Sequence, residues 1–189
     1  MQAGRRLDAR GWVPATAGNL SIRLDPARIA ITRSGVHKGF LRPDDVIVVD
    51  GAGRPEQDGV RPSAETLLHC QIYQRFPEAC AVLHGHSVPG TVLSMQDRRL
   101  QFRGFEVQKV FEAQRDHEST LDLPVVENDQ DIPRLSRIVA PLLDATRLGY
   151  LIRGHGTYVW AADMPTALAR FEGLEFLLSC ELERRRIAA

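Results

Sequence analysis

The sequence predicts an α/β fold with three layers, in which a central mixed, mostly antiparallel sheet lies between two layers of helices. In the first fifty residues, short β-branched runs follow one another with tight turns between them, which is typical of antiparallel strands. Later strands alternate with segments whose apolar residues recur at helical spacing, which is typical of helices that cover a sheet. A length of 189 residues fits one core, so we expect residues 1–189 to form a single domain.

Each expected strand is a short apolar or β-branched run closed by glycine, proline or aspartate. The expected strands are 20–24, 29–32, 46–49, 80–84, 100–103, 124–127, 148–152 and 157–160. Each expected helix has apolar residues three and four positions apart. The expected helices are one with Ser63 as its N-cap that stops before Pro77, a short one from Ser87, one over 132–143, and an amphipathic C-terminal helix entered through Asp163 and Pro165.

Composition excludes several classes of protein. Apolar residues make up 43% of the chain and charged residues 25%, as in ordinary folded proteins rather than disordered ones. Lys plus Arg and Asp plus Glu are both 24, and this zero net charge argues against nucleic acid and favours a small substrate. No apolar run suits a signal peptide or a membrane span, so we expect a cytoplasmic protein. The three cysteines form no Cys-x-x-Cys, so reduced thiols are expected.

Three histidines form a candidate metal site. His84 and His86 close an apolar strand, and the strand's period of two places both imidazoles on the same side. His155 lies between two glycines directly after another expected strand. Three neutral imidazoles with an open fourth position are the ligand set of a catalytic zinc ion. The alternative interpretation of His155 is an ordinary residue of a turn. The remaining histidines are expected to be surface or packing residues: His37, His69 and His117.

Four short segments rich in glycine, serine and free amides are candidates for anion binding. They are 18–21, 32–35, 37–39 and 62–63. Each segment by itself also fits a structural turn, because glycine, asparagine and serine favour turns for conformational reasons. Combined with a metal site, they predict a pocket that holds a phosphorylated hydroxy-ketone at both ends.

Two glutamates are candidate proton carriers beside the metal. Glu65 lies close to one of the anion-binding segments, and Glu106 lies between Phe105 and Val107. Burial between those two apolar residues is expected to raise the pKa of Glu106 toward neutrality, which suits general acid–base catalysis. The alternative for either glutamate is an ordinary charged position on a helix surface.

The ordered set of motifs resembles the class II aldolases over nearly the whole chain. The motifs are Gly18-Asn19-Leu20-Ser21, Thr32-Arg33-Ser34-Gly35, Pro62-Ser63-Ala64-Glu65, His84-Gly85-His86 and Arg153-Gly154-His155-Gly156. Within that superfamily, three further regions resemble the methylthioribulose-1-phosphate dehydratases. These regions are 12–19, 34–39 and 106–109.

The resemblance implies a homotetramer with its active site at a subunit junction and one zinc ion per subunit on His84, His86 and His155. It implies that Glu106 is the acid–base residue, whereas Glu65 matches the glutamate that aldolases use beside the metal. It also implies a set of phosphate-binding residues, which are Asn19, Ser34, Gly35, Lys38 and Ser63. One departure concerns Ser63-Ala64, where aldolases usually have two serines, and Lys38 is expected to supply the missing donor.

The reaction that the resemblance implies is the loss of water from 5-methylthioribulose 1-phosphate, which gives 2,3-diketo-5-methylthiopentyl 1-phosphate in methionine salvage. The alternatives are a class II sugar-phosphate aldolase or a pentulose-phosphate 4-epimerase, which share the zinc chemistry and differ in the bond that is broken next. An alternative of another class is a non-catalytic protein that the metal stabilises. Such a structural site is closed by four protein ligands, and its removal unfolds the chain.

Overall fold

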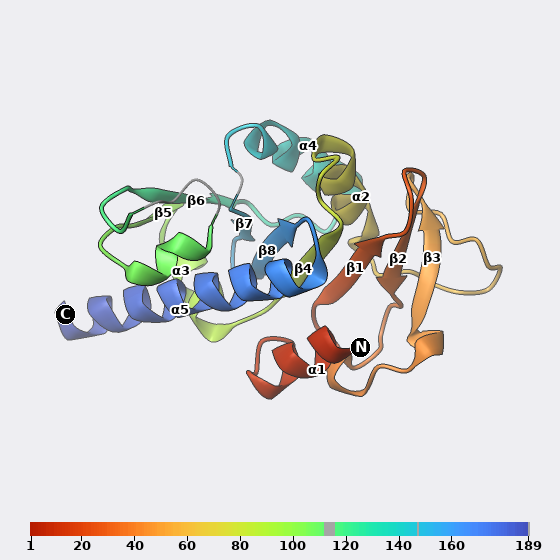
Figure 1. The fold of residues 1–189 in the computed structure, drawn as a ribbon, viewed down its shortest axis with the longest axis horizontal. Helices are drawn as coiled ribbons and strands as arrows, with labels where there is room; N and C mark the ends of the chain where they lie inside the picture. Colours follow the sequence, from red (N-terminus) through yellow and green to blue (C-terminus); the bar gives the residue numbers. More distant parts are fainter. Residues whose placement is uncertain (112–115, 147, 189) are drawn as a thin grey trace.

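An eight-stranded sheet forms the centre of the computed structural model, which describes residues 1–111, 116–146 and 148–188 (Figure 1). The strands are β1 (Asn19–Arg23), β2 (Arg28–Thr32), β3 (Val46–Asp50), β4 (Ala81–Gly85), β5 (Arg99–Phe102), β6 (Leu121–Val126), β7 (Tyr150–Ile152) and β8 (Gly156–Ala161). Their order across the sheet is β3-β2-β1-β4-β8-β7-β6-β5. β4 therefore lies in the interior of the sheet, between β1 and β8.

Neighbouring strands in the described part of the chain pair antiparallel, with the exception of the parallel pair β6 and β7. This confirms the predicted mixed, mostly antiparallel sheet. β4 pairs with β1 through Asn19 and His84, and with β8 through Gly85 and Thr157. These registers bring three distant parts of the chain together at one end of β4.

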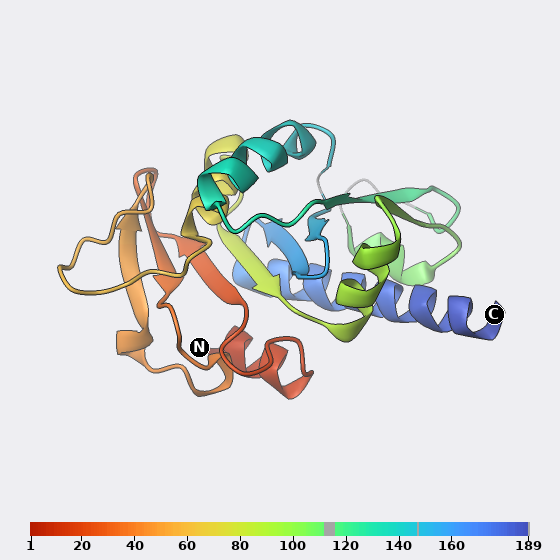
Figure 2. The ribbon, with the colours of Figure 1, turned by 180° about the vertical axis from the view of Figure 1, so that it is seen from behind.

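Helices cover both faces of the sheet (Figures 1 and 2). The helices are α1 (Gln2–Ala9), α2 (Thr66–Arg75), α3 (Val88–Gln96), α4 (Ile132–Leu143) and α5 (Met164–Ala188), with the short 3-10 turns η1 (Lys38–Phe40), η2 (Pro43–Asp45) and η3 (Glu106–Val110). α2 and α4 lie together over one face, and α5 lies with α1 and α3 over the other. The three-layer arrangement that the sequence predicts is thereby confirmed.

Side-chain alternation along β4 divides the core into two apolar clusters. Ala81 and Leu83 belong to the cluster that includes residues of α5, whereas Val82 belongs to the cluster that includes residues of α2 and α4. All three side chains are buried. Because His84 continues the alternation of Val82, its imidazole lies on the α2 face of the sheet.

The expected helix start at Ser63 is wrong, because α2 begins at Thr66. The preceding residues are held in an extended conformation: Pro62 forms an isolated β-bridge with Arg33, and the Ser34 amide donates to the Arg61 carbonyl at 3.0 Å. Ser63 contributes its backbone carbonyl, not its hydroxyl, to the first turn. This tether delays the helix and keeps Ser63 beside the loop that follows β2.

Other expected elements are present with small shifts in their bounds. α4 spans 132–143 as predicted, and the carboxylate of Asp163 accepts a hydrogen bond from the Thr166 amide at the start of α5, at 2.7 Å. The sequence analysis did not predict α1 or the short 3-10 turns. Within the described residues, no helix has both the length and the apolar character needed to cross a membrane.

Candidate metal and anion site

Three histidines meet at the end of β4. His84 belongs to β4, His86 follows that strand, and His155 lies in the tight turn between β7 and β8. Their ring centroids are 4.6 Å, 4.7 Å and 5.2 Å apart, and one ligand nitrogen from each ring lies within 4.8 Å of the other two. The pairing of β4 with β8 places the turn beside the strand end, so the predicted meeting of the three side chains is confirmed.

His84 is oriented for coordination through Nε2. Its Nδ1 lies 3.0 Å from the carbonyl oxygen of Thr157, and because a carbonyl only accepts, Nδ1 carries the proton. The ring is fully buried and stacks on Tyr158, with centroids 4.1 Å apart. Nε2 is buried and makes no hydrogen bond with the described residues, although Oε2 of Glu65 lies 3.1 Å away. A buried acceptor without a partner, fixed by a carbonyl at its other nitrogen, fits a metal ligand.

The other two imidazoles are also suited to bind a metal. Burial and the neighbouring His84 ring lower the pKa of His86 to about 3, and burial lowers the pKa of His155. Nδ1 of His155 lies 3.4 Å from Oδ1 of Asn128. Neutral imidazole is the form that binds metals, and three such donors fit Zn²⁺ or a similar divalent cation.

Glu65 lies between the histidines. Its Oε2 is 3.1 Å from Nε2 of His84 and its Oε1 is 3.2 Å from Nε2 of His155, while Nδ2 of Asn19 donates to Oε2 at 2.9 Å. Burial opposes ionisation of this carboxyl group, but the two imidazoles and the Asn19 amide outweigh it, so the pKa of Glu65 is lowered. An ionised carboxylate thus borders the metal-ligand group.

A cavity of about 370 Å³ opens in front of this group. The side chains of Glu65, His86 and His155 line it. All four segments that the sequence analysis selected for anion binding contribute to its wall, through Gly18, Asn19, Arg33, Ser34, Gly35, Lys38 and Ser63. The structure thus brings the five expected phosphate-binding residues together beside the candidate metal site, and their role toward phosphate stays a prediction.

Gly18 allows the loop before β1 to approach β4 closely. Its φ is +74°, and a Cβ at this position would lie 2.6 Å from Cγ1 of Val13 and 2.7 Å from the carbonyl oxygen of His84. Gly35 on the opposite wall also has a positive φ, of +76°. Glycine is favoured at both positions because other residues rarely adopt this conformation.

Lys38 is buried, and its ammonium group already binds the protein. Nζ donates to the carbonyl oxygens of Thr16 at 2.6 Å and of Val36 at 2.8 Å, and burial lowers the pKa of Lys38 to about 8. An ammonium group has three N–H donors, so one is left for a ligand in the cavity. Lys38 therefore joins two loops of the wall and keeps one donor for the role expected from the sequence.

Glu106 differs from its expected environment. Its side chain is 75% exposed, and Nζ of Lys109 donates to Oε1 at 2.6 Å, which lowers the pKa of Glu106. Phe105 and Val107 pack against the apolar cluster under α5, so Glu106 points outward. The expectation of burial and a raised pKa is wrong within this chain, and Glu106 does not line the cavity.

The sequence analysis missed several residues of the site. Asp129, Gln130 and Ile132 also line the cavity. His69, expected at the surface or in packing, is completely buried, and its two ring nitrogens contact Asn19 and Ser21. A usable signal was present, because residues 65, 69 and 73 follow one another at intervals of four, as residues on one helix face do.

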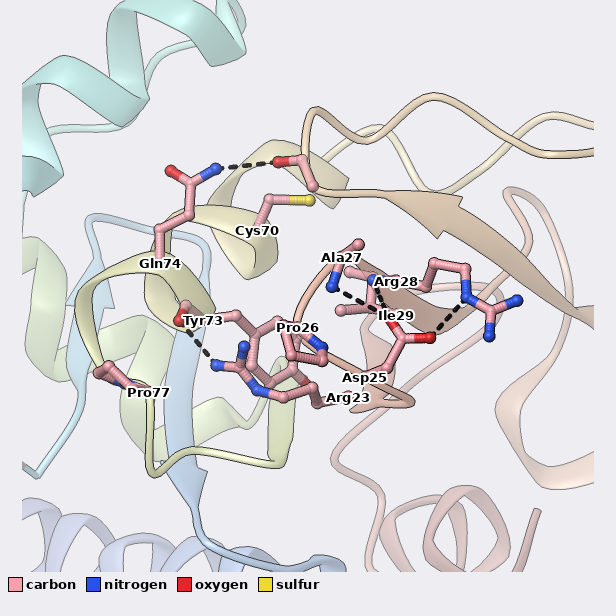
Figure 3. Close-up of a pocket in the computed structure, with 11 residues that line it drawn as sticks. Arg23, Asp25, Pro26, Ala27, Arg28, Ile29, Cys70, Tyr73, Gln74 and Pro77 are labelled. Atoms are coloured by element: carbon pink, nitrogen blue, oxygen red, sulfur yellow. Dashed lines mark hydrogen bonds and ion pairs between the residues drawn. The ribbon is translucent and has the colours of Figure 1, made fainter.

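A second hollow, of about 230 Å³, lies between β2 and α2 (Figure 3). Its polar groups bind one another: Arg23 donates to the carbonyl oxygen of Tyr73 at 2.7 Å, Arg28 to Asp25 at 2.6 Å, and Gln74 to the carbonyl oxygen of Gly51 at 2.9 Å. The described residues offer no cluster of metal ligands there. The cavity beside the histidines is therefore the candidate functional site.

Known proteins are similar to this chain in fold and in sequence. The family described as Class II Aldolase and Adducin N-terminal domain matches residues 1–182. A methylthioribulose-1-phosphate dehydratase of Gluconacetobacter diazotrophicus is 61% identical over 98% of this chain and 92% of its own length, and one of Pseudomonas syringae pv. tomato is 50% identical over 99% and 94%. The L-fuculose-1-phosphate aldolase of Thermus thermophilus has a TM-score of 0.81 and 28% identity, over 99% of this chain and 93% of that one. The chain belongs to the class II aldolase and adducin family, and within it to the group of the methylthioribulose-1-phosphate dehydratases.

Proposed function

We propose that this enzyme removes water from 5-methylthioribulose 1-phosphate to form 2,3-diketo-5-methylthiopentyl 1-phosphate, as a zinc-dependent hydro-lyase of methionine salvage. One observation carries the proposal: Glu65 and two members of the histidine group, His86 and His155, line the same cavity as the segments suited to bind an anion. The names of the similar enzymes support the substrate. The alternatives are a sugar-phosphate aldolase, which the similarity to the Thermus aldolase favours, or a pentulose-phosphate 4-epimerase.

In this proposal, the phosphate group of the substrate binds in the cavity wall. The donors there are side-chain amide, hydroxyl and ammonium groups and backbone N–H groups, which together suit an anion. They come from Asn19, Ser34, Gly35, Lys38 and Ser63. Because these residues belong to separate loops tied together by Lys38, the phosphate end is held in a fixed position relative to Glu65.

The sugar end then lies beside His84, His86 and His155. These three residues would hold a zinc ion, which would supply Lewis acidity toward the carbonyl of the substrate. A carboxylate takes the proton from C3, and the hydroxyl group at C4 leaves as water after it receives a proton. We assign the proton transfer to Glu106 of a neighbouring subunit in a homotetramer, because Glu106 is exposed on its own subunit, and we place Glu65 beside the metal.

Product masses test the reaction. We expect the zinc-loaded protein to convert 5-methylthioribulose 1-phosphate into a product that is lighter by one water, and to leave fuculose 1-phosphate and ribulose 5-phosphate unchanged. Chromatographic separation of the isomeric sugar phosphates followed by mass spectrometry of the three incubations distinguishes the candidates. Cleavage into two fragments would favour the aldolase, and turnover of ribulose 5-phosphate without a change in mass would favour the epimerase.

Metal removal separates a catalytic site from a structural one. We expect His155→Ala to lose bound zinc and activity while its thermal unfolding temperature falls by only a few degrees, because a three-ligand site contributes less to folding than a closed four-ligand site. Elemental analysis and thermal unfolding are the measurements. Global unfolding after chelation of the wild-type protein would contradict a catalytic role for the metal.

A further inference from the structure

A chain of buried hydrogen bonds leads away from Glu65 into the core. Asn19 Nδ2 donates to Glu65, and Asn19 Oδ1 contacts Nε2 of His69. Nδ1 of His69 is 2.7 Å from Oγ of Ser21, which is 2.8 Å from the hydroxyl oxygen of Tyr73. The five groups come from β1 and from α2 with the residue before it, and none is more than 7% exposed.

Donor and acceptor can be assigned for every hydrogen bond in this series from Glu65 to Tyr73. Glu65 only accepts, so the Asn19 amide turns its NH₂ toward the carboxylate and its oxygen toward His69. Burial lowers the pKa of His69 to about 3, so the ring is neutral and carries one proton, which must lie on Nε2. Nδ1 is then an acceptor for the Ser21 hydroxyl, whose oxygen accepts from Tyr73.

The reverse arrangement is strongly disfavoured. If His69 carried its proton on Nδ1, its bare Nε2 would face the Asn19 oxygen, or the amide would rotate and turn that oxygen toward the carboxylate of Glu65. Either outcome places two acceptors in contact, and the burial of these groups leaves no water to relieve it. The carboxylate of Glu65, acting through the Asn19 amide, therefore selects the tautomer of His69, and the Ser21 hydroxyl donates to the bare Nδ1.

We propose that His69 is a positioning residue: as the Nε2–H tautomer, with Nδ1 accepting from Ser21, it holds the Asn19 amide with its NH₂ group toward Glu65 and the cavity. One N–H then fixes the carboxylate beside the histidines, and the second remains for an anion, because Asn19 lines the cavity. A single amide thus couples the carboxylate to the anion-binding wall. The kinetic consequences of this inference rest on the proposed function. The tautomer of His69 and the orientation of the Asn19 amide rest on the hydrogen bonds alone.

Substitution of His69 tests the kinetic part. We expect His69→Phe, which keeps a ring in the space beside Tyr158, to lower kcat by about 10–100-fold and to weaken the binding of inorganic phosphate. His69→Gln keeps an N–H donor toward Asn19 and should recover part of both losses. Leu68→Ala is the matched control, because Leu68 is a buried core residue on the same helix, and its destabilisation should leave kcat, KM and phosphate affinity unchanged.

Nitrogen-15 NMR of the histidine side chains supplies a readout that does not depend on turnover. We expect His69 in the intact protein to be protonated at Nε2 and bare at Nδ1 from pH 5.5 to 8.5, and Ser21→Ala to shift the Nδ1 resonance because that nitrogen loses its hydrogen-bond donor. If His69→Phe fails to fold, Ser21→Ala carries the test, with a smaller loss of phosphate affinity expected. An Nδ1–H tautomer of His69 in the wild-type protein would overturn the proposal. Unchanged phosphate affinity in every variant of His69 and Ser21 that folds would also overturn it.

The two proposals fail differently. If no sugar phosphate is turned over by the wild-type protein, the proposed function is wrong, while the tautomer and the phosphate affinity still decide the role of His69. If the wild type is active and His69→Phe retains its kcat, KM and phosphate affinity, the positioning role is wrong and the dehydratase stands.

Discussion

Glu175 on α5 is a carboxyl group enclosed by the core. It is 1% exposed, its Oε1 accepts from the Thr157 hydroxyl at 3.2 Å, and its Oε2 has no hydrogen-bond partner among the described residues. Burial raises the pKa of Glu175 from 4.5 to about 7. The backbone carbonyl of the same threonine holds His84, so this carboxyl group lies behind the candidate metal site.

Glu175 should make the stability of the protein depend on pH. Below pH 4.5 it is protonated in both states, and its favourable contribution to folding is fully present. As the pH rises to about 7, the unfolded chain ionises first, so up to about 3 kcal/mol of unfolding free energy is lost. In urea unfolding, we expect the unfolding free energy of Glu175→Gln to equal that of the wild type near pH 4.5 and to be higher than that of the wild type at pH 8.

The matched control for Glu175 is Glu183→Gln, because Glu183 lies on the same helix with an exposed side chain. This variant should follow the wild-type curve at every pH. Parallel curves for Glu175→Gln and the wild type would contradict the assignment of a raised pKa.

Individual residues of the site differ in how far the sequence predicts them. His84 and His86 follow from the period of one strand, and His155 from the glycines that enclose it. The spacing of residues 65 and 69 places His69 on the helix face of Glu65, but its hydrogen-bond partner could not be predicted, because Asn19 lies 50 positions away in the sequence. The burial of Glu106 was wrongly expected because side-chain direction in a 3-10 turn is set by tertiary packing.

At the scale of elements, the loop that leads into β1 forms one wall of the cavity. Gly18 is required there because its positive φ and the closeness of Val13 and the His84 carbonyl leave no room for a Cβ. Gly11, at the beginning of the same connection, also has a positive φ, of +72°, but a Cβ there would meet no atom within 4 Å. A side chain at Gly11 therefore meets only the penalty of a positive φ, whereas a side chain at Gly18 also meets a steric clash.

We expect Gly18→Ala to reduce the unfolding free energy by clearly more than Gly11→Ala. Gly11→Ala should cost about 1 kcal/mol, because only the left-handed conformation is penalised, whereas Gly18→Ala must also displace backbone. Denaturant unfolding measures both, and calorimetry should show weaker phosphate binding for Gly18→Ala. Equal losses of stability would show that the loop moves away at little cost.

Most elements follow from periodicity, but their ends depend on contacts distant in sequence. α4 was predicted from apolar spacing, and α5 from apolar spacing together with Asp163 at its start. The start of α2 was not, since the tether between Ser34 and Arg61 is a tertiary contact. Sequence neighbours that form hairpins, such as β1 with β2, are predictable, whereas the pairing of β4 with β8 is not.

At the scale of the whole molecule, the two candidate carboxylates lie on different layers. Glu65 borders the histidines on the α2 side of the sheet, whereas Glu106 lies on a 3-10 turn that packs on α5. In a single chain they do not share the cavity. The proposed homotetramer, with its active site at a subunit junction, therefore predicts that Glu65 and Glu106 of one site come from different subunits.

Mixed oligomers test that prediction. We expect Glu106→Gln and His155→Ala each to be inactive, and co-expressed mixtures to recover about a quarter of wild-type activity, because some junctions combine intact groups from two subunits. His84→Ala mixed with His155→Ala is the control, since both ligands come from one subunit and cannot be complemented. Inactive mixed oligomers in the first pair would exclude Glu106 as a residue supplied across the junction.

The position of β4 between strands from distant parts of the chain has a consequence for biosynthesis. His84 and His86 leave the ribosome well before His155, and the contact that orients His84 spans 73 positions. A nascent chain thus carries two of the three imidazoles with no third partner until β8 has been made and docked. Loading of a metal ion at the candidate site would then be a late event that follows formation of the native sheet, so a chain stalled before residue 155 should purify without bound metal.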